Sequence, residues 1–130
     1  MFRNKKFEIG SLINSIIQIK VFSGAEIELD DAKVIRKEVL EVAKGNKYAI
    51  FLDASETFEI TGEARKLISE IENASQRIAI AFYIKSLPNK LAGNFFIKIN
   101  RPISPTKLFS SKESALAWLK EEVEKVIKNV

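Results

Sequence analysis

The stretch YAIFL at residues 48–52 is a continuous apolar run that ends at Asp53. Five residues are too few for a helix, and a run without polar alternation is typical of a strand buried on both faces. A second run of this kind, IAIAFYI, occupies residues 78–84. Two such strands with a helix-length segment between them predict parallel pairing through a right-handed crossover.

The flanking residues predict the remaining elements. Residues 7–13 and 17–21 alternate between apolar and polar or small side chains around the turn Asn14-Ser15, which predicts an antiparallel hairpin. Helical spacing of apolar residues behind capping residues predicts four helices: one after Asp30, one after Thr61, one over residues 86–99 and one after Ser110. Residues 107–109 predict a short strand before the last helix.

The predicted order is therefore β-β-α-β-α-β-α-β-α. This order defines an α/β fold: a single-layer, mixed, mostly parallel sheet of about five strands, with an antiparallel edge and four helices. The chain has 130 residues and contains no linker, low-complexity segment or internal repeat. We therefore expect one domain over residues 1–130.

This order and several segments resemble the STAS / SpoIIAA-like family, in particular its small stand-alone bacterial members of unknown function. Residues 50–55 and 58–64 are similar to the family's apolar strand that ends in Asp-x-Ser and the glycine-containing turn that opens a helix. Residues 116–119, preceded by 107–109, are similar to the family's ending, and residues 91–96 resemble a segment of its small members.

The resemblance implies a non-enzymatic role. Family members include anti-sigma-factor antagonists, which bind a kinase partner and are switched by phosphorylation at the turn. Their turn reads Asp-Ser-Ser-Gly, with the first serine as the acceptor. Here residues 59–62 read Glu-Ile-Thr-Gly, so Ile60, which has no hydroxyl, stands at the acceptor position and Thr61 at the second hydroxyl position.

The composition argues against most enzyme classes without excluding an enzyme. The chain has no histidine and no cysteine, which removes the commonest general base, thiolate metal sites and the usual partner of a nucleophilic serine. Gly62 and Gly93 stand alone, so no glycine-rich phosphate loop is present. We expect no catalytic residue, no metal ligand set and no cofactor.

Four residues form the candidate switch or partner loop: Asp53, Ser55, Thr61 and Glu63. Asp53 and Ser55 follow a central strand, where open α/β sheets place ligands, but such a carboxylate also caps loop backbone donors. Phosphate on Thr61 would lie at a helix N-terminus, but helix capping alone also explains a threonine there. Both interpretations stay open for each pair.

Residues 73–112 contain no acidic residue, which predicts that any basic face of the protein belongs to this segment. Its candidate basic and apolar surface consists of Lys90, Phe96, Lys98 and Arg101. Aromatic and cationic side chains together can hold single-stranded nucleic acid, but no recognised motif supports that function and we consider it the weaker interpretation. The alternative function is a small-molecule or lipid carrier in which the helix at 86–99 covers an apolar pocket.

The expected partner is another protein, and a small apolar ligand is the alternative. No apolar run approaches the roughly 20 residues that span a bilayer, so we expect a cytoplasmic protein without a transmembrane segment. The outer strand of the N-terminal hairpin offers an edge through which two copies can pair, which makes a dimer possible.

Overall fold

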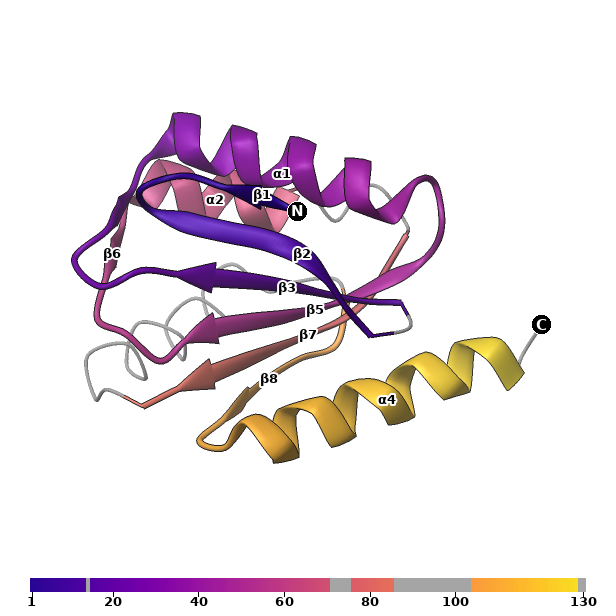
Figure 1. The fold of residues 1–130 in the computed structure, drawn as a ribbon. Coiled ribbons are helices and arrows are strands. Elements are labelled where there is room, and N and C mark those ends of the chain that lie inside the picture. The colour runs from indigo at the N-terminus through magenta and orange to yellow at the C-terminus, as the bar shows by residue number, and fades with distance from the viewer. Residues whose placement is uncertain (14, 71–75, 86–103, 129–130) are drawn as a thin grey trace.

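The structure is a computed structural model that describes residues 1–13, 15–70, 76–85 and 104–128. Six strands form one mixed sheet in the order β1-β2-β3-β5-β7-β8 (Figure 1). These strands are β1 (Phe2–Arg3), β2 (Phe7–Ile13), β3 (Ile16–Val21), β5 (Tyr48–Ala54), β7 (Arg77–Ile84) and β8 (Thr106–Phe109). Two short strands, β4 (Glu26–Ile27) and β6 (Glu59–Ile60), pair separately and parallel.

The predicted hairpin and the predicted parallel core are both confirmed. Strands β2 and β3 are antiparallel, and Ser15 in the connecting turn has a φ of 62°. Strands β3, β5, β7 and β8 are parallel to one another. The apolar run at residues 48–52 lies in the middle of this sheet. Four of its five side chains are buried, and Leu52 is half-buried.

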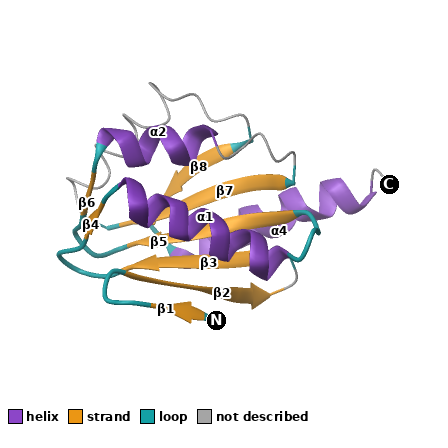
Figure 2. Cartoon of the chain, turned by 90° about the horizontal axis from the view of Figure 1, so that it is seen from above, coloured by secondary structure: helices purple, strands orange, loops and turns teal. Residues whose placement is uncertain are grey.

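Helices cover both faces of the sheet (Figures 1 and 2). The helices α1 (Leu29–Ala43) and α2 (Gly62–Glu70) lie on one face, and α4 (Lys112–Lys128) lies on the other. Because side chains alternate along a strand, the sheet contributes to two cores. The first contains Phe7 and Ile50 below α1 and α2, and the second contains Phe51 below α4.

The prediction of about five strands and four helices is wrong for the described part of the chain. The main sheet has six strands, because Phe2 and Arg3 pair with Ile9 and Glu8 as β1. Two residues show no measurable alternation, so the sequence pattern could not reveal this strand. The described residues contain three helices, and the helix predicted over 86–99 lies outside them.

Two predicted helix caps are displaced by one or two residues. Helix α1 has Glu28 rather than Asp30 as its N-cap, and the backbone N–H of Glu28 donates to Asp31 Oδ2 at 2.9 Å. Ser111 rather than Ser110 caps α4, because its Oγ accepts the N–H of Ser114 at 3.0 Å. Capping depends on local backbone geometry, and neighbouring polar residues compete for the position.

No helix in the described ranges combines the length and the apolar character that crossing a bilayer requires.

Candidate functional site

The first half of the predicted loop, Asp53 and Ser55, lies at the carboxyl end of β5. Asp53 is 9% exposed, and its Oδ1 accepts two hydrogen bonds from Ser55, one from the backbone N–H at 3.0 Å and one from Oγ at 2.6 Å. The carboxylate therefore closes a local turn, as the structural interpretation of this pair predicted. Ser55 remains half-buried and forms part of the surface at this edge.

The second half, Thr61 and Glu63, lies at the beginning of α2. Thr61 Oγ1 accepts the backbone N–H of Ala64 at 3.1 Å, which confirms Thr61 as the N-cap. Glu63 is exposed in the first turn, where a negative charge interacts favourably with the helix dipole. The hydrogen bonds of Asp53 are therefore with Ser55, and that of Thr61 is with Ala64. The first pair lies at the beginning of the loop between β5 and α2, and the second pair lies at its end.

The loop between these pairs is held by residues 24–27, which follow the N-terminal hairpin. The backbone N–H of Gly24 donates to Thr57 O at 2.8 Å, and that of Glu59 donates to Ala25 O at 2.9 Å. The N–H of Thr61 donates to Ile27 O at 3.0 Å. The bonds from Glu59 and Thr61 belong to the β4–β6 pair, and the three bonds together fix the start of α2 against the residues that precede α1. The loop is therefore preorganised.

One residue from each strand of the main sheet lies in a single row. The pairings that define the row are Arg3↔Glu8, Glu8↔Lys20, Lys20↔Asp53, Asp53↔Tyr83 and Tyr83↔Phe109. Paired residues lie on the same face of a sheet. Tyr83 and Phe109 belong to the core below α4, so the row lies on that face. Asp53 is therefore flanked by Lys20 on one side and an aromatic ring on the other.

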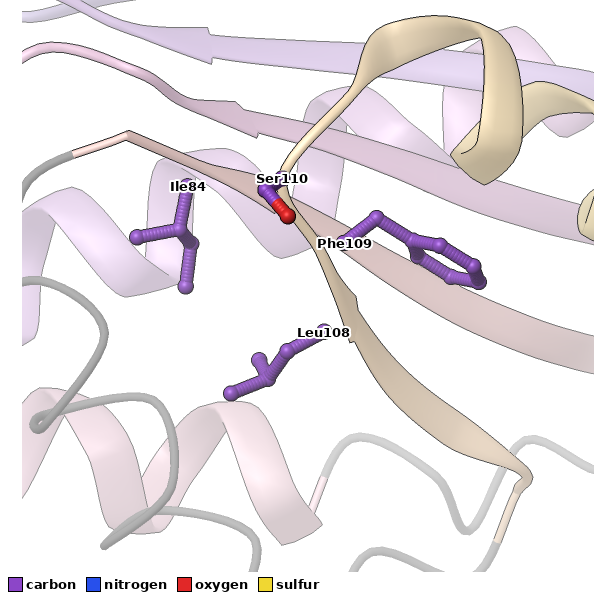
Figure 3. A pocket seen from close by; sticks show the side chains of 4 residues that line it. All are labelled: Ile84, Leu108, Phe109 and Ser110. Atoms are coloured by element: carbon purple, nitrogen blue, oxygen red, sulfur yellow. The ribbon is translucent and has the colours of Figure 1, made fainter.

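A pocket of about 140 Å³ opens at the carboxyl ends of β7 and β8. Its described lining consists of Ile84, Leu108, Phe109 and Ser110 (Figure 3). Leu108 and Phe109 point to opposite sides of β8. The volume is below the roughly 300–1,000 Å³ of typical small-molecule sites. The helix predicted as a lid over an apolar ligand lies outside the described residues.

The candidate basic surface, Lys90, Phe96, Lys98 and Arg101, also lies outside the described residues. Two described lysines of the acid-free segment lie against aromatic rings. Lys85 Nζ is 5.8 Å from the centroid of the Tyr83 ring, and Lys107 Nζ is 5.6 Å from that of Phe109. Within the described ranges, no group of three or more acidic side chains gathers as a metal site would require.

A pair with shifted pKa values, buried Tyr48 and half-buried Arg77, lies at the opposite, amino end of the sheet. Tyr48 and Arg77 are partners in the β5–β7 register. Burial lowers the pKa of Arg77 to about 10, although the neighbouring Tyr48 opposes this, and burial raises the pKa of Tyr48. Arg77 is therefore still charged at neutral pH, and its Nε donates to Ser104 Oγ at 3.2 Å. We interpret this pair as structural, because parallel sheets bind ligands at the carboxyl ends of their strands.

Comparison with solved structures identifies the fold as SpoIIAA-like. An uncharacterized protein of the DUF3478 family with a SpoIIAA-like fold, from Shewanella loihica PV-4, superimposes with a TM-score of 0.63 at 14% identity, over 92% of this chain and 98% of the other. The anti-sigma factor antagonist SpoIIAA in its unphosphorylated form gives 0.57 at 14% identity, over 88% and 97%. The Bacillus cell fate determinant SpoIIAA in its phosphorylated form gives 0.51 at 15% identity, over 85% and 96%.

The resemblance to the SpoIIAA-like group is thereby confirmed at the level of the fold. By sequence, residues 11–123 match the family described as a domain of unknown function, DUF7793, and the chain belongs to that family. No protein with a curated description matches the sequence.

Proposed function

We propose that this protein is a non-catalytic regulatory module, a single STAS-like domain over residues 1–130, that binds a partner protein in the bacterial cytoplasm. The observation that carries the proposal is the likeness to SpoIIAA, an anti-sigma factor antagonist, over 88% of this chain. The surface that we assign to the partner is the loop edge with Asp53, Ser55, Thr61 and Glu63.

The preorganisation of this loop supports the assignment. The backbone bonds from Gly24, Glu59 and Thr61 fix the loop before a partner arrives, so that little conformational entropy is lost on binding. Ser55 and Thr61 are half-buried and Glu63 is exposed, so the loop offers hydroxyl groups and one carboxylate to a partner. Loops held by a rigid scaffold are a common place for binding residues.

Within this loop, Thr61 is the position that suits a phosphate switch. A phosphoryl group there would stand beside the unpaired amides and the positive dipole end of α2. It would also compete for the N–H of Ala64, which Thr61 Oγ1 now accepts. Ile60, at the family's acceptor position in β6, pairs with Ile27 of β4 and has no hydroxyl.

The test begins with affinity purification of the protein from its own host and intact mass measurement of the untagged chain. The purified partner is then titrated by calorimetry against the wild type, Glu63→Arg and Thr61→Glu. A matched control, Glu41→Arg, changes a carboxylate on α1 that is also exposed. We expect Glu63→Arg and Thr61→Glu to raise the Kd by about tenfold or more, and the control to stay within about twofold.

Equal affinities for the loop variants and the wild type would contradict the assignment of the surface. A turnover activity that is lost in Asp53→Asn would contradict the non-catalytic role. A phosphate-sized mass increment that disappears in Thr61→Val would establish the switch, and a phosphate mapped to another residue would overturn it.

A further inference from the structure

The structure brings the described lysines of the acid-free segment together around a connected group of aromatic rings. The rings of Phe51 and Tyr83 are stacked with centroids 6.2 Å apart, and Tyr83 is the register partner of Phe109. Phe109 contacts Trp118 of α4, with centroids 5.6 Å apart. All four rings belong to the core below α4, but only Phe51 is fully buried.

Three exposed lysines surround these rings. Lys85 lies over Tyr83 and Lys107 over Phe109, and Lys112 Nζ is 6.0 Å from the centroid of Phe51. Lys85 directly follows β7, Lys107 lies in β8 and Lys112 is in the first turn of α4. We call the three lysines and four rings the lysine–aromatic cluster.

Among the described residues, no ion pair includes a lysine of this cluster. Ion pairs elsewhere in the described part of the chain join Arg3 to Glu8, Lys6 to Asp31, Lys33 to Asp30 and Lys125 to Glu122, and none of them includes a cluster lysine. Of the residues that the structure describes, Asp53 and Glu113 are acidic neighbours of the cluster. Asp53 pairs with Tyr83 in the register and accepts hydrogen bonds from Ser55, and Glu113 follows Lys112. The cluster therefore presents three exposed ammonium groups beside aromatic rings.

We infer that the lysine–aromatic cluster is a docking surface for an acidic segment of a partner protein. Carboxylates are the complement of unpaired ammonium groups, and complementary charge steers association and fixes its register. The pocket lined by Ile84, Leu108, Phe109 and Ser110 opens beside the cluster and is of a size for one apolar side chain of that segment. The inference rests on the proposed role as a protein-interaction module and adds a second surface, which borders the Asp53–Glu63 loop at Asp53.

A protein segment fits this surface better than a nucleic acid does. Single-strand binding requires a cationic groove that follows several phosphates and rings whose faces are open to bases. The described part of the surface has three lysines, and its rings pack against one another or lie beneath the lysines. Asp53 and Glu113 would also repel a continuous phosphate backbone. A short protein segment with two or three carboxylates can contact the lysines and keep its negative charges away from Asp53 and Glu113.

Trp118 allows a direct test, because it is the single tryptophan of the chain and belongs to the cluster. The probe is a ten-residue peptide with five glutamates, one central leucine and four glycines, titrated against the full chain at low salt while tryptophan emission is recorded. A second peptide carries glutamines in place of the glutamates. A ten-nucleotide oligothymidine and vesicles of phosphatidylglycerol and phosphatidylcholine are titrated in parallel.

The variants are the triple substitution Lys85→Gln, Lys107→Gln and Lys112→Gln, and a control triple with the same change of charge, Lys5→Gln, Lys37→Gln and Lys47→Gln. All six lysines are exposed, and circular dichroism checks that both proteins are folded. We expect saturable binding of the glutamate peptide that weakens with salt, a Kd raised about tenfold or more in the cluster variant, and a change of at most about twofold in the control.

Equal binding of the glutamine peptide, equal loss in both triple variants, or a response to oligothymidine or vesicles without one to the glutamate peptide would overturn the inference. The peptide titration needs no native partner, so its result is independent of the proposed function. A native partner that is lost with Glu63→Arg but retained by the cluster variant would leave the proposed function standing and refute the acidic docking surface for that partner.

Discussion

The two faces of the sheet have different compositions. The face below α1 and α2 is packed with large aliphatic side chains, among them Ile9, Ile17 and Ile50, together with Phe7. The face below α4 has alanines in β5 and β7 where the helix approaches, and aromatic rings with lysines over them toward the carboxyl ends. The first face therefore provides most of the apolar burial. The second face has smaller core side chains, and its aromatic rings near the carboxyl ends are only partly buried.

A core substitution on each face tests this difference and carries the largest expected effect. Phe7 is fully buried, so Phe7→Ala should lower the free energy of unfolding by about 3–5 kcal/mol. Tyr83 is half-buried, so Tyr83→Ala should cost about 1–2 kcal/mol. Urea unfolding followed by circular dichroism measures both. Equal losses would show that the two faces contribute alike to stability.

The helix caps should not differ between the faces. Thr61 caps α2 and Ser111 caps α4 through the same type of hydrogen bond. Thr61→Ala and Ser111→Ala should each reduce stability by about 1 kcal/mol. Ser110→Ala, one residue before the α4 cap, should change it by less than about 0.5 kcal/mol. A larger loss of stability for Ser110→Ala than for Ser111→Ala in the same urea assay would show that Ser110, the cap predicted from the sequence, caps α4.

The ion pairs of the two faces should respond differently to pH. Lys6 Nζ lies 2.7 Å from Asp31 Oδ2 and also donates to Glu26 O, which ties the hairpin to α1. Burial raises the pKa of Asp31, but hydrogen bonds from Lys6 and from the Glu28 backbone outweigh it, so the pKa lies below the ordinary 3.8. The hydrogen bond to Asp31 raises the pKa of Lys6.

The pKa of Asp31 determines how the stability of the protein changes with pH. Since the folded-state pKa of Asp31 is depressed, its stabilising contribution is complete above pH 3.8 and is lost as the pH falls through the folded-state value. Asp31→Asn should therefore flatten the fall of the urea midpoint on acidification. On the opposite face, Arg3 and Glu8 are 3.8 Å apart and the Arg3 side chain is 69% exposed, so Arg3→Gln should leave the acid profile unchanged. Identical acid profiles for Asp31→Asn and the wild type would show that the Lys6–Asp31 ion pair does not stabilise the fold.

The smallest expected effect concerns the lysines over the rings. Lys107→Gln removes an exposed cation 5.6 Å from the centroid of Phe109 and should lower the free energy of unfolding by less than about 1 kcal/mol. Thermal unfolding of this variant beside Lys37→Gln measures the difference. A loss comparable to that of Phe7→Ala would mean that Lys107 holds the fold together rather than serving a surface role.

Much of the candidate site could be predicted from local sequence. Thr61 stands directly before an amphipathic pattern, so its role as a cap followed from the residues around it. Asp53 and Ser55 are two positions apart, a spacing at which a carboxylate closes a turn on its own backbone. The support of the loop by residues 24–27 could not be predicted, because β4 and β6 are two residues long and more than 30 positions apart in the chain.

The sequence by itself determined which segments become strands and helices in most of the described chain, because apolar periodicity and the length of apolar runs are local properties. It also showed that residues 73–112 contain basic residues and no acidic residue. Only the tertiary structure decided that Lys85, Lys107 and Lys112 surround one group of rings, and that Arg3, Glu8, Lys20 and Asp53 share one row. The physical reason is strand register, which depends on crossovers and on packing between segments distant in the chain.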